Sequence, residues 1–384
     1  MERVALAVIG GGVAGVAAAL AARRAGLDVV LVRRAPGASA LGGGGWRGPL
    51  AAPLADALGA GGLAHEPVSH PLPHPDGELR AFDYAPRSHA AAVIETGACV
   101  IGIEGFPTYR ATALAGMWGH AARAELVAAH VHLPDTPAAG WGTASLAHAI
   151  AADPRPLGDA LRETAARTNC TRFVLPAVLG TSGVEQVRAA IEQAAGVPVG
   201  EALGTAPSLP GLRLVRAFEN ALAAAGVTLV EGRVVDVHDE GAGVTTLEVL
   251  PTGAASSIRI TAGACVLATG RFTGGGIVAD PQFVETVFGA PVGVDHLGEQ
   301  FEEADPLALT DPVRTEPQPL LAAGVRVAAG NRLLGTRAAS GAQNLYAAGA
   351  VRAGLEDGLG FAALDGERAV EGLLSADRGE VTWP

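Results

Sequence analysis

The chain has 384 residues, 49% of them hydrophobic, and its 39 acidic against 27 basic side chains give a formal net charge of −12. This length favours two globular domains over one, and the acidic balance disfavours nonspecific binding to nucleic acid or to an anionic membrane. No apolar run approaches the roughly 18 residues of a membrane span. The first predicted strand begins almost at Met1 with no secretory signal before it, so we expect a cytoplasmic protein.

The first motif is a glycine-rich turn between a predicted strand and a predicted helix. An apolar run at 4–9 leads into the sequence G-G-G-V-A-G at 10–15, an alanine-rich helix is predicted to about residue 25, and a second apolar run covers 29–32. In a βαβ unit, such glycines permit the tight turn and let backbone approach a pyrophosphate at the helix N-terminus. We therefore predict a dinucleotide site, with contacts from Gly10, Gly12, Val13, Ala14 and Gly15.

The second strand ends in Arg33 and Arg34. Dinucleotide folds usually place an acidic residue here, about 20 residues after the glycines, to bind a ribose hydroxyl. Arg33 is predicted either to meet the 2′-phosphate of NADP or to cover the adenine or a phosphate of FAD. A solvated basic turn is the alternative, and both arginines are candidate cofactor contacts.

A second glycine cluster occupies residues 42–45 and precedes Trp46. Four glycines leave backbone N–H groups uncovered, which suits close approach to a flat ring or a phosphate. Gly43 and Gly44 are therefore candidate cofactor contacts. A flexible loop without a ligand is the alternative.

Prolines interrupt residues 52–87, which we predict to be irregular. The histidines there and just beyond match no metal-binding spacing, so we predict no metal site. The three cysteines form no C-x-x-C pair and cannot supply the four thiolates of a cubane iron–sulfur cluster; Cys99 and Cys265 fall in apolar strand-like runs and are predicted to be core residues.

Residues 70–205 alternate α and β patterns without a second glycine fingerprint, and we interpret them as an inserted cap or substrate domain. Strands are predicted at 98–103, 126–133 and 172–175, and helices at 108–123, 144–152, 156–168 and 184–195.

Regular order returns with a helix predicted at 212–225 and strands at 227–237, 245–250 and 257–261. An apolar strand at 264–267 then closes in Ala268, Thr269 and Gly270. A meander that ends in a buried strand and an A-T-G turn often accompanies the glycine fingerprint in two-domain flavoproteins. These three residues and Val234 are candidate cofactor contacts.

In the C-terminal region we predict a strand at 344–351 and a helix at 361–374. The strand contains two candidate cofactor contacts, Gly349 and Ala350. In a flavoprotein the positive end of this helix dipole faces the pyrimidine edge of the ring, where negative charge grows on reduction. Ordinary docking of a C-terminal helix on the sheet is the alternative. The candidate contacts at the helix start are Gly360, Phe361 and Ala362.

Five segments together resemble the B subunit of anaerobic glycerol-3-phosphate dehydrogenase. They are the glycine fingerprint, VIGIEGFPTY at 100–109, PSLPGLRLVRAF at 207–218, ATGRFTGGG at 268–276 and the strand at 344–351. The resemblance implies a fumarate reductase-like flavoprotein that works with a second, catalytic flavoprotein subunit and an iron–sulfur subunit and passes electrons toward membrane quinone. It also favours FAD over NADP, because members tend to lack the acid after the second strand.

One departure from this family is the glycine run at 42–45, where a serine-rich run is usual. That difference leaves the flavin-edge contacts and the substrate open. The catalytic residues are unknown. Candidates for binding an anionic substrate, each with an ordinary structural or surface role as the alternative, are Arg110, His120, Arg271 and Arg314.

The predicted fold is α/β, a two-domain FAD-binding Rossmann-like flavoprotein with an inserted cap domain. The FAD-binding domain is predicted at 1–69, 206–275 and 336–384, and the cap or substrate domain at 70–205 and 276–335. FAD is the predicted cofactor, with FMN as an alternative, and its binding is noncovalent because residues 33–64 contain neither His nor Cys.

The predicted function is that of an FAD-binding dehydrogenase subunit. It moves electrons from a small anionic substrate or a partner flavin toward an iron–sulfur or quinone acceptor, and membrane association comes only through partners. Two alternatives remain open: a self-sufficient FAD- or NADP-linked oxidoreductase, and an assembly subunit whose nucleotide site is structural.

Overall fold

The computed structural model describes residues 2–134, 136–241, 243–279, 282–294, 302–303, 318–336 and 344–380. Contacts between Cα atoms divide the chain into two units. Unit 1 comprises Met1–Ser39, Gly48–Leu54 and Phe218–Pro384, and unit 2 comprises Ala40–Arg47 and Ala55–Ala217.

Unit 1 is built on a sheet whose central strand is β1 (Glu2–Ile9). Strand β1 runs parallel to β2 (Val29–Arg33) on one side and to β13 (Ile258–Leu267) on the other, and β19 (Leu345–Ala347) pairs in parallel with β13. These strands are almost continuously apolar because a parallel sheet is covered on both faces. Their register aligns the carboxyl ends of β1, β13 and β19 at one edge of the sheet.

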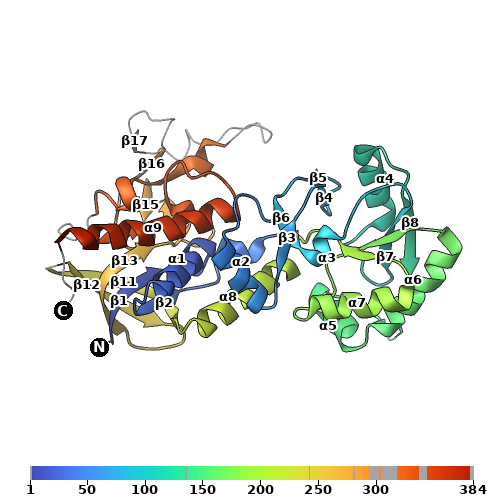
Figure 1. Ribbon diagram of the computed structural model, residues 1–384, viewed down its shortest axis with the longest axis horizontal. Helices are drawn as coiled ribbons and strands as arrows, with labels where there is room; N and C mark the ends of the chain where they lie inside the picture. The colour runs from blue at the N-terminus through green and yellow to red at the C-terminus, as the bar shows by residue number, and fades with distance from the viewer. Residues whose placement is uncertain are drawn as a thin grey trace. The chain divides into compact units, whose positions relative to one another are not determined.

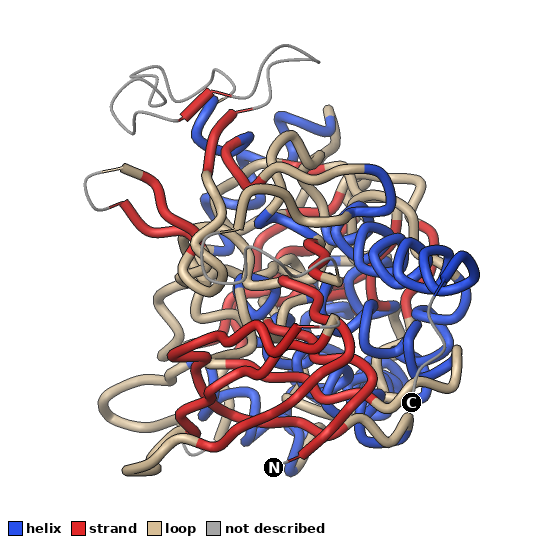
Figure 2. The backbone as a smooth tube through the Cα atoms, turned by 90° about the vertical axis from the view of Figure 1, so that its left-hand side faces the viewer, coloured by secondary structure: helices blue, strands red, loops and turns tan. Residues whose placement is uncertain are grey.

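A meander extends this sheet, and Figure 2 shows its long strands (red) lying side by side. Strand β11 (Thr228–Gly241) runs parallel to β2 and antiparallel to β12 (Val244–Pro251), which pairs antiparallel with β13. The prediction of two strands at 257–261 and 264–267 was wrong, because β13 is one strand. Its first half pairs with β12 and its second half with β1 and β19, so backbone pairing continues through Gly263.

Two helices of unit 1, α1 (Val13–Arg24) and α9 (Leu359–Glu380), lie side by side in Figure 1. Their close approach depends on Gly366, where an added Cβ would lie 2.2 Å from the Ala14 carbonyl oxygen. Helix α8 (Leu209–Ala224) begins in unit 2 and ends in unit 1. The shorter strands of unit 1 are β14 (Ile277–Ala279), β15 (Phe283–Glu285), β16 (Val292–Val294), β17 (Glu302–Glu303) and β18 (Ala323–Val325).

Unit 2 contains a parallel sheet in the order β10-β9-β7-β8, formed by the segment in which strand and helix patterns were predicted to alternate. Its strands are β7 (Ala98–Ile103), β8 (Val127–Val131), β9 (Arg172–Leu175) and β10 (Val199–Glu201), and its helices include α4 (Ala111–Ala122), α5 (Thr143–Ala152), α6 (Arg155–Thr168) and α7 (Val184–Ala195). Strand β10 was not predicted, because three residues are too few to show a periodicity.

Residues 52–87 are more regular than predicted. Helix α2 (Ala52–Ala60) forms there because Pro53 falls in the first turn, where a backbone N–H has no helical partner to lose. Two short ribbons pair β3 (His65–Pro67) with β6 (Tyr84–Pro86) and β4 (Leu72–Pro73) with β5 (Leu79–Arg80), and α3 (Arg87–Ala90) follows.

The two units differ from the predicted domain boundaries at three places. Unit 2 includes residues 40–47, 55–69 and 206–217, which were predicted to belong to the FAD-binding domain. Unit 1 includes the described residues of 276–335, which were predicted to belong to the cap domain. The last difference has a packing cause, because Phe288 and Val325 share one apolar core with Ile9 of β1.

All three cysteines are buried. Burial, together with the neighbouring Cys170, raises the pKa of the Cys99 thiol to about 12, and burial raises that of Cys265 to about 12. Core packing of Cys99 and Cys265 is therefore confirmed.

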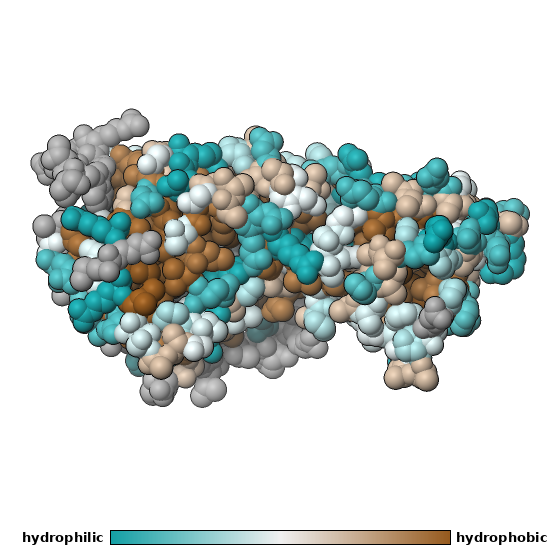
Figure 3. All heavy atoms as spheres, turned by 90° about the horizontal axis from the view of Figure 1, so that it is seen from below, coloured by the Kyte–Doolittle hydropathy of each residue, from teal (hydrophilic) through white to brown (hydrophobic). Residues whose placement is uncertain are grey.

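Apolar residues also reach the surface of unit 1, and Figure 3 shows a broad group of them (brown) on one face. In the described part of this unit, the exposed large apolar side chains are Val235, Ile258, Val278, Val284 and Leu321. Among the residues described, no helix combines the length and apolar character that crossing a membrane requires.

Candidate functional site

Three turns of unit 1 meet at the carboxyl edge of the parallel strands. Two of them, at 10–15 and 268–270, were predicted. The third was predicted as part of a strand at 344–351, but β19 ends at Ala347 and residues 349–351 form a 3₁₀ turn. The backbone N–H of Ala268 donates to the Ile9 carbonyl at 2.8 Å, and that of Ala348 donates to the Leu267 carbonyl at 2.8 Å. These bonds place the glycine turn at 10–15, the turn at 268–270 and the turn at 349–350 next to one another. Ligands of open α/β sheets bind at this edge.

The fingerprint glycines are required for different reasons. Gly10 has φ +130° and an added Cβ would lie 2.1 Å from the Ala268 carbonyl oxygen, while a Cβ at Gly15 would lie 2.0 Å from the Gly10 carbonyl oxygen. Gly12 has φ −77° and ψ 175°, an extended conformation that any residue adopts. The nearest atom to its added Cβ is the Ser39 Oγ, at 3.7 Å. The protein's own packing therefore requires Gly10 and Gly15 but leaves open space at Gly12, which fits a group bound against the turn.

Sequence reasoning missed the return of the loop after β2 to the glycine turn. The Ser39 Oγ is buried and accepts a hydrogen bond from the Val13 N–H at 3.1 Å, so it caps the first turn of α1. Gly37, at φ +77°, packs its backbone against Gly12. A Cβ added at Gly37 would lie 3.2 Å from the Gly12 Cα. The only local signal was a glycine and a serine shortly after the strand.

The turn at Gly349 is held by a carboxylate that sequence reasoning also missed. Asp365 of α9 is 1% exposed and its Oδ2 accepts a hydrogen bond from the Gly349 N–H at 2.8 Å. Its Oδ1 accepts from Asn331 Nδ2 at 3.0 Å and from Arg352 Nη1. Gly349 also needs to be glycine, because at φ +76° an added Cβ would lie 2.5 Å from the Ala14 Cβ. Helix α9 thus fixes this turn against the start of α1.

The start of α9 is packed just as closely. At Gly360 an added Cβ would lie 2.4 Å from the carbonyl carbon of Gly48 and 2.4 Å from the carbonyl oxygen of Pro49. Phe361 follows and contacts Gly48 as well. The first turn of this helix is therefore set in place by the chain segment that begins at Gly48.

Arg33 is not the solvated residue that one alternative predicted, because it is 6% exposed. Its Nε and Nη2 donate to the Glu231 Oε1 at 2.9 and 2.6 Å, and Nη2 also donates to Glu219. Burial alone lowers the pKa of Arg33, but the two carboxylates raise it by more, so the guanidinium stays charged. Arg34, by contrast, is exposed.

The glycine run at 42–45 belongs to unit 2, whereas the fingerprint belongs to unit 1, and packing within unit 2 accounts for the glycines of the run. Added Cβ atoms at Gly43, Gly44 and Gly45 would lie 2.7 Å from the Gly204 carbonyl oxygen, 2.5 Å from the His89 Nε2 and 2.5 Å from the Phe82 ring. Cofactor contact by Gly43 and Gly44 stays a prediction, as does contact by Val234, which lies beside a bulge in β11.

Of the four candidate anion-binding residues, two belong to one helix of unit 2, one belongs to unit 1 and one is not described. Arg110 is the N-cap of α4 and His120 lies in its last turn, and ten residues of helix separate them by about 15 Å. Arg314 lies outside the described residues. Arg271 follows β13 in unit 1; its Nε donates to the Ala323 carbonyl at 2.9 Å, while its buried Nη2 has no partner among the described residues. Burial lowers the pKa of Arg271, and Asp357 opposes that shift.

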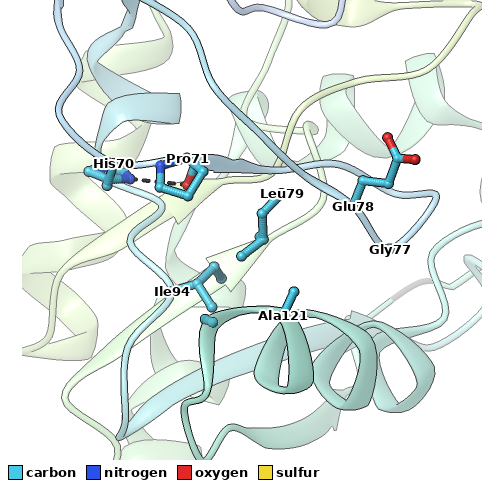
Figure 4. Close-up of a pocket in the computed structure, with 8 residues that line it drawn as sticks. His70, Pro71, Gly77, Glu78, Leu79, Ile94 and Ala121 are labelled. Atoms are coloured by element: carbon cyan, nitrogen blue, oxygen red, sulfur yellow. Dashed lines mark hydrogen bonds between the residues drawn. The ribbon is translucent and has the colours of Figure 1, made fainter.

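A groove of about 750 Å³ lies in unit 2. Figure 4 shows Leu79 and Ile94 directed toward the helix that carries Ala121, with the Glu78 carboxylate turned away from them. Among the predicted site residues that the structure describes, none lines this groove.

A cluster on the meander has the composition of a metal site. The ligand atoms of Asp236, His238 and Glu248 lie within 4.8 Å of one another. The His238 Nε2 is 3.5 Å from Asp236 Oδ2 and 3.9 Å from Glu248 Oε2, an ordinary arrangement for a surface ion pair. The expectation of no metal site stays a prediction.

Comparison with known proteins gives a family and partial relatives. Residues 5–354 match the family model described as FAD dependent oxidoreductase. Two strains of Halobacterium salinarum have a protein named as the B subunit of a probable anaerobic glycerol-3-phosphate dehydrogenase, which is 41% identical over 138 residues. That match covers 35% of this chain and 32% of the relatives' length, so it spans about a third of each.

Three solved structures are similar at low identity. They are a 3-ketosteroid-Δ4-(5α)-dehydrogenase from Rhodococcus jostii (14% identity, 98% and 97% of the two chains, TM-score 0.39), a flavocytochrome c3 fumarate reductase in an open conformation (14%, 98% and 78%, TM-score 0.38) and a thioredoxin reductase from Gloeobacter violaceus (11%, 100% and 99%, TM-score 0.37). The family model covers most of the chain, residues 5–354, and the match includes the glycine turn with its open space at Gly12. The chain therefore belongs to the family of FAD dependent oxidoreductases, with FAD as its cofactor.

Proposed function

We propose that this chain is the FAD-binding subunit of a dehydrogenase that resembles anaerobic glycerol-3-phosphate dehydrogenase, with unit 1 as the FAD-binding domain and unit 2 as the cap or substrate domain. It moves electrons from a small anionic substrate or a partner flavin toward an iron–sulfur or quinone acceptor. The observation that carries the proposal is the open glycine turn of unit 1, next to the turns at 268–270 and 349–350. The partial relatives support the choice of dehydrogenase.

In this proposal the pyrophosphate of FAD lies against Gly12 and the first amides of α1, which have no partner inside the helix. Ala268, Thr269, Gly270, Gly349 and Ala350 line the path toward the ring. The start of α9, at Gly360, Phe361 and Ala362, presents a positive helix end to the ring, where it stabilises added negative charge. FAD itself supplies the hydride-accepting chemistry, and the chain binds and orients it.

The substrate side of the proposal rests on Arg271. Its buried Nη2 lacks a partner among the described residues, and a buried donor of this kind is costly unless a ligand satisfies it. A carboxylate or phosphate supplies the matching acceptors. A glycerol 3-phosphate-like anion is therefore the proposed substrate class.

An absorption experiment tests cofactor and substrate together. We expect the purified protein to show the bands of oxidised flavin, to release FAD on denaturation because the link is noncovalent, and to bleach anaerobically with glycerol 3-phosphate. Glycerol, which lacks the phosphate, is the control and should leave the bands unchanged. A colourless protein that reconstitutes with neither FAD nor FMN would contradict the proposal, and bleaching by glycerol alone would contradict the anionic substrate.

The proposed partners are a second flavoprotein and an iron–sulfur protein, because three buried cysteines cannot build an electron relay within this chain. The apolar residues gathered on one face of unit 1 in Figure 3 are the candidate contact surface. We expect both partners to co-elute with the protein from its native host, as identified by mass spectrometry. A monomer that oxidises glycerol 3-phosphate at full rate with a soluble dye would rule out the dependence.

A further inference from the structure

The end of β2 lacks the acidic residue that dinucleotide folds use to bind the adenosine ribose, yet a carboxylate lies beside it. We infer that Glu231, from the neighbouring strand β11, accepts the hydrogen bonds of the ribose hydroxyls of FAD, and that Arg33 acts as the residue that positions it. The inference rests on the proposed placement of FAD at the glycine turn and goes beyond it by assigning the ribose contact.

Sheet register brings Glu231 to this position. Strands β2 and β11 are parallel, and Glu231 is the register partner of Arg33, the last residue of β2. The two side chains therefore start from the same edge of the sheet as the glycine turn. No local spacing in the sequence could show this, because 198 residues separate the pair.

Arg33 ties the carboxylate to the glycine turn. Its aliphatic stem packs against Gly11, where an added Cβ would lie 2.5 Å from the Arg33 Cδ. Its guanidinium then reaches Glu231, and both of the contacts to that carboxylate use Oε1, at 2.9 and 2.6 Å. The Glu231 Oε2 has no partner among the described residues, and the side chain is 50% exposed, so an acceptor oxygen remains for a ligand.

The second carboxylate of the cluster, Glu219, differs in its origin. It comes from helix α8 and not from the sheet, and it contacts Arg33 through Nη2 alone. Its side chain is 39% exposed. We assign it to neutralising Arg33 and not to the ribose, which makes it a matched control for Glu231.

The charge of the cluster selects the ligand. One guanidinium and two carboxylates sum to a net charge of −1, which favours hydroxyl donors and repels an added phosphate dianion. The site should therefore accept an unmodified ribose and disfavour a 2′-phosphorylated one. This contradicts the alternative in which Arg33 binds the 2′-phosphate of NADP.

The test measures FAD binding to apoprotein by quenching of flavin fluorescence, with ADP and 2′-deoxy-ADP as competitors. Glu231→Gln keeps the shape but loses the charge, and a hydrogen bond to a charged group contributes enough for an expected loss of about tenfold in FAD affinity. Wild-type protein should prefer ADP over 2′-deoxy-ADP, and Glu231→Gln should lose that preference. Glu219→Gln should keep FAD affinity within about twofold and keep the preference.

Arg33→Met tests the positioning role, because a buried methionine fills the space without holding the carboxylate. This variant should show a lower preference for ADP over 2′-deoxy-ADP than the wild-type protein. Its thermal midpoint, measured by circular dichroism, should show that it is folded. Unchanged preference in Glu231→Gln, or an equal loss in Glu219→Gln, would overturn the assignment. Failure of wild-type protein to bind FAD at all would instead contradict the proposed cofactor site.

Discussion

Gly12→Val is expected to leave the protein folded and to abolish FAD binding. The backbone at Gly12 already has an extended conformation, and the nearest atom to an added Cβ is 3.7 Å away, so the apoprotein accommodates the side chain. The valine then occupies the space that we assign to the pyrophosphate, where close backbone approach is needed. The measurement is the ratio of flavin to protein absorbance, with the thermal midpoint of the apoprotein recorded in parallel.

Gly15→Ala is the matched control, because it changes a glycine of the same turn for a different reason. Its Cβ would lie 2.0 Å from the Gly10 carbonyl oxygen, so this variant should lose stability by about 1–3 kcal/mol or more. Gly12→Val thus tests whether a ligand occupies the space beside the turn, and Gly15→Ala tests the packing of the turn within the protein. Full flavin occupancy in Gly12→Val would show that the pyrophosphate does not lie on this turn.

Arg213→Met is expected to destabilise unit 2 by about 3–5 kcal/mol, the usual cost of leaving one charge of a buried pair uncompensated. Arg213 Nη1 and Nη2 donate to Glu201 Oε2 and Oε1 at 2.6 and 3.0 Å, and the two side chains are 3% and 0% exposed. Arg213 Nε also donates to the Gly180 carbonyl at 2.8 Å, and Glu201 Oε1 accepts from the Leu179 N–H at 2.7 Å. Urea unfolding followed by circular dichroism measures the change.

Arg216→Met, on the same helix, is the control. Arg216 is exposed and its Nη1 donates to Thr181 Oγ1 at 2.7 Å, so its removal should change the free energy of unfolding by only about 0.5 kcal/mol. A loss below about 1 kcal/mol in Arg213→Met would contradict the importance of the buried pair.

The pH dependence of stability is a second test of the buried Arg213–Glu201 pair. Burial alone raises the pKa of Glu201, but Arg213 and the hydrogen bonds lower it by more, so it lies below its usual value. The stabilisation is therefore complete above the unfolded-state pKa of about 4.3 and is lost as the pH falls toward the folded-state pKa. In Arg213→Met the largest contribution that opposes burial is lost, and only His89 and the Leu179 N–H still favour the charged carboxylate. The pKa of Glu201 therefore rises, and stability should increase as the pH falls and the carboxyl takes up a proton.

The α/β class and the segments around the fingerprint could be predicted from the sequence, because their signals are local. Period-two and continuous apolar runs predict the strands that became β1, β7 and β9, and helical periodicity predicts α1 and α7. The glycine turn was recognised because it needs a strand before it and a helix after it, and both are present within the first 33 residues. Relatedness to FAD dependent oxidoreductases followed from five short segments, each recognisable from its own sequence, that are spread over most of the chain.

Other features depended on the tertiary structure, because they join residues that no local spacing relates. The partner of Arg33 comes from β11, 198 residues later in the chain, and the carboxylate that holds the Gly349 turn comes from Asp365 in the helix that follows it. The continuity of β13 depends on pairing with three other strands. Composition and spacing by themselves determined the class of fold and the strands, helix and turn around the fingerprint. Short elements such as β10 and α2, the glycines that the fold needs and the places where its charges are neutralised were decided by long-range pairing and burial.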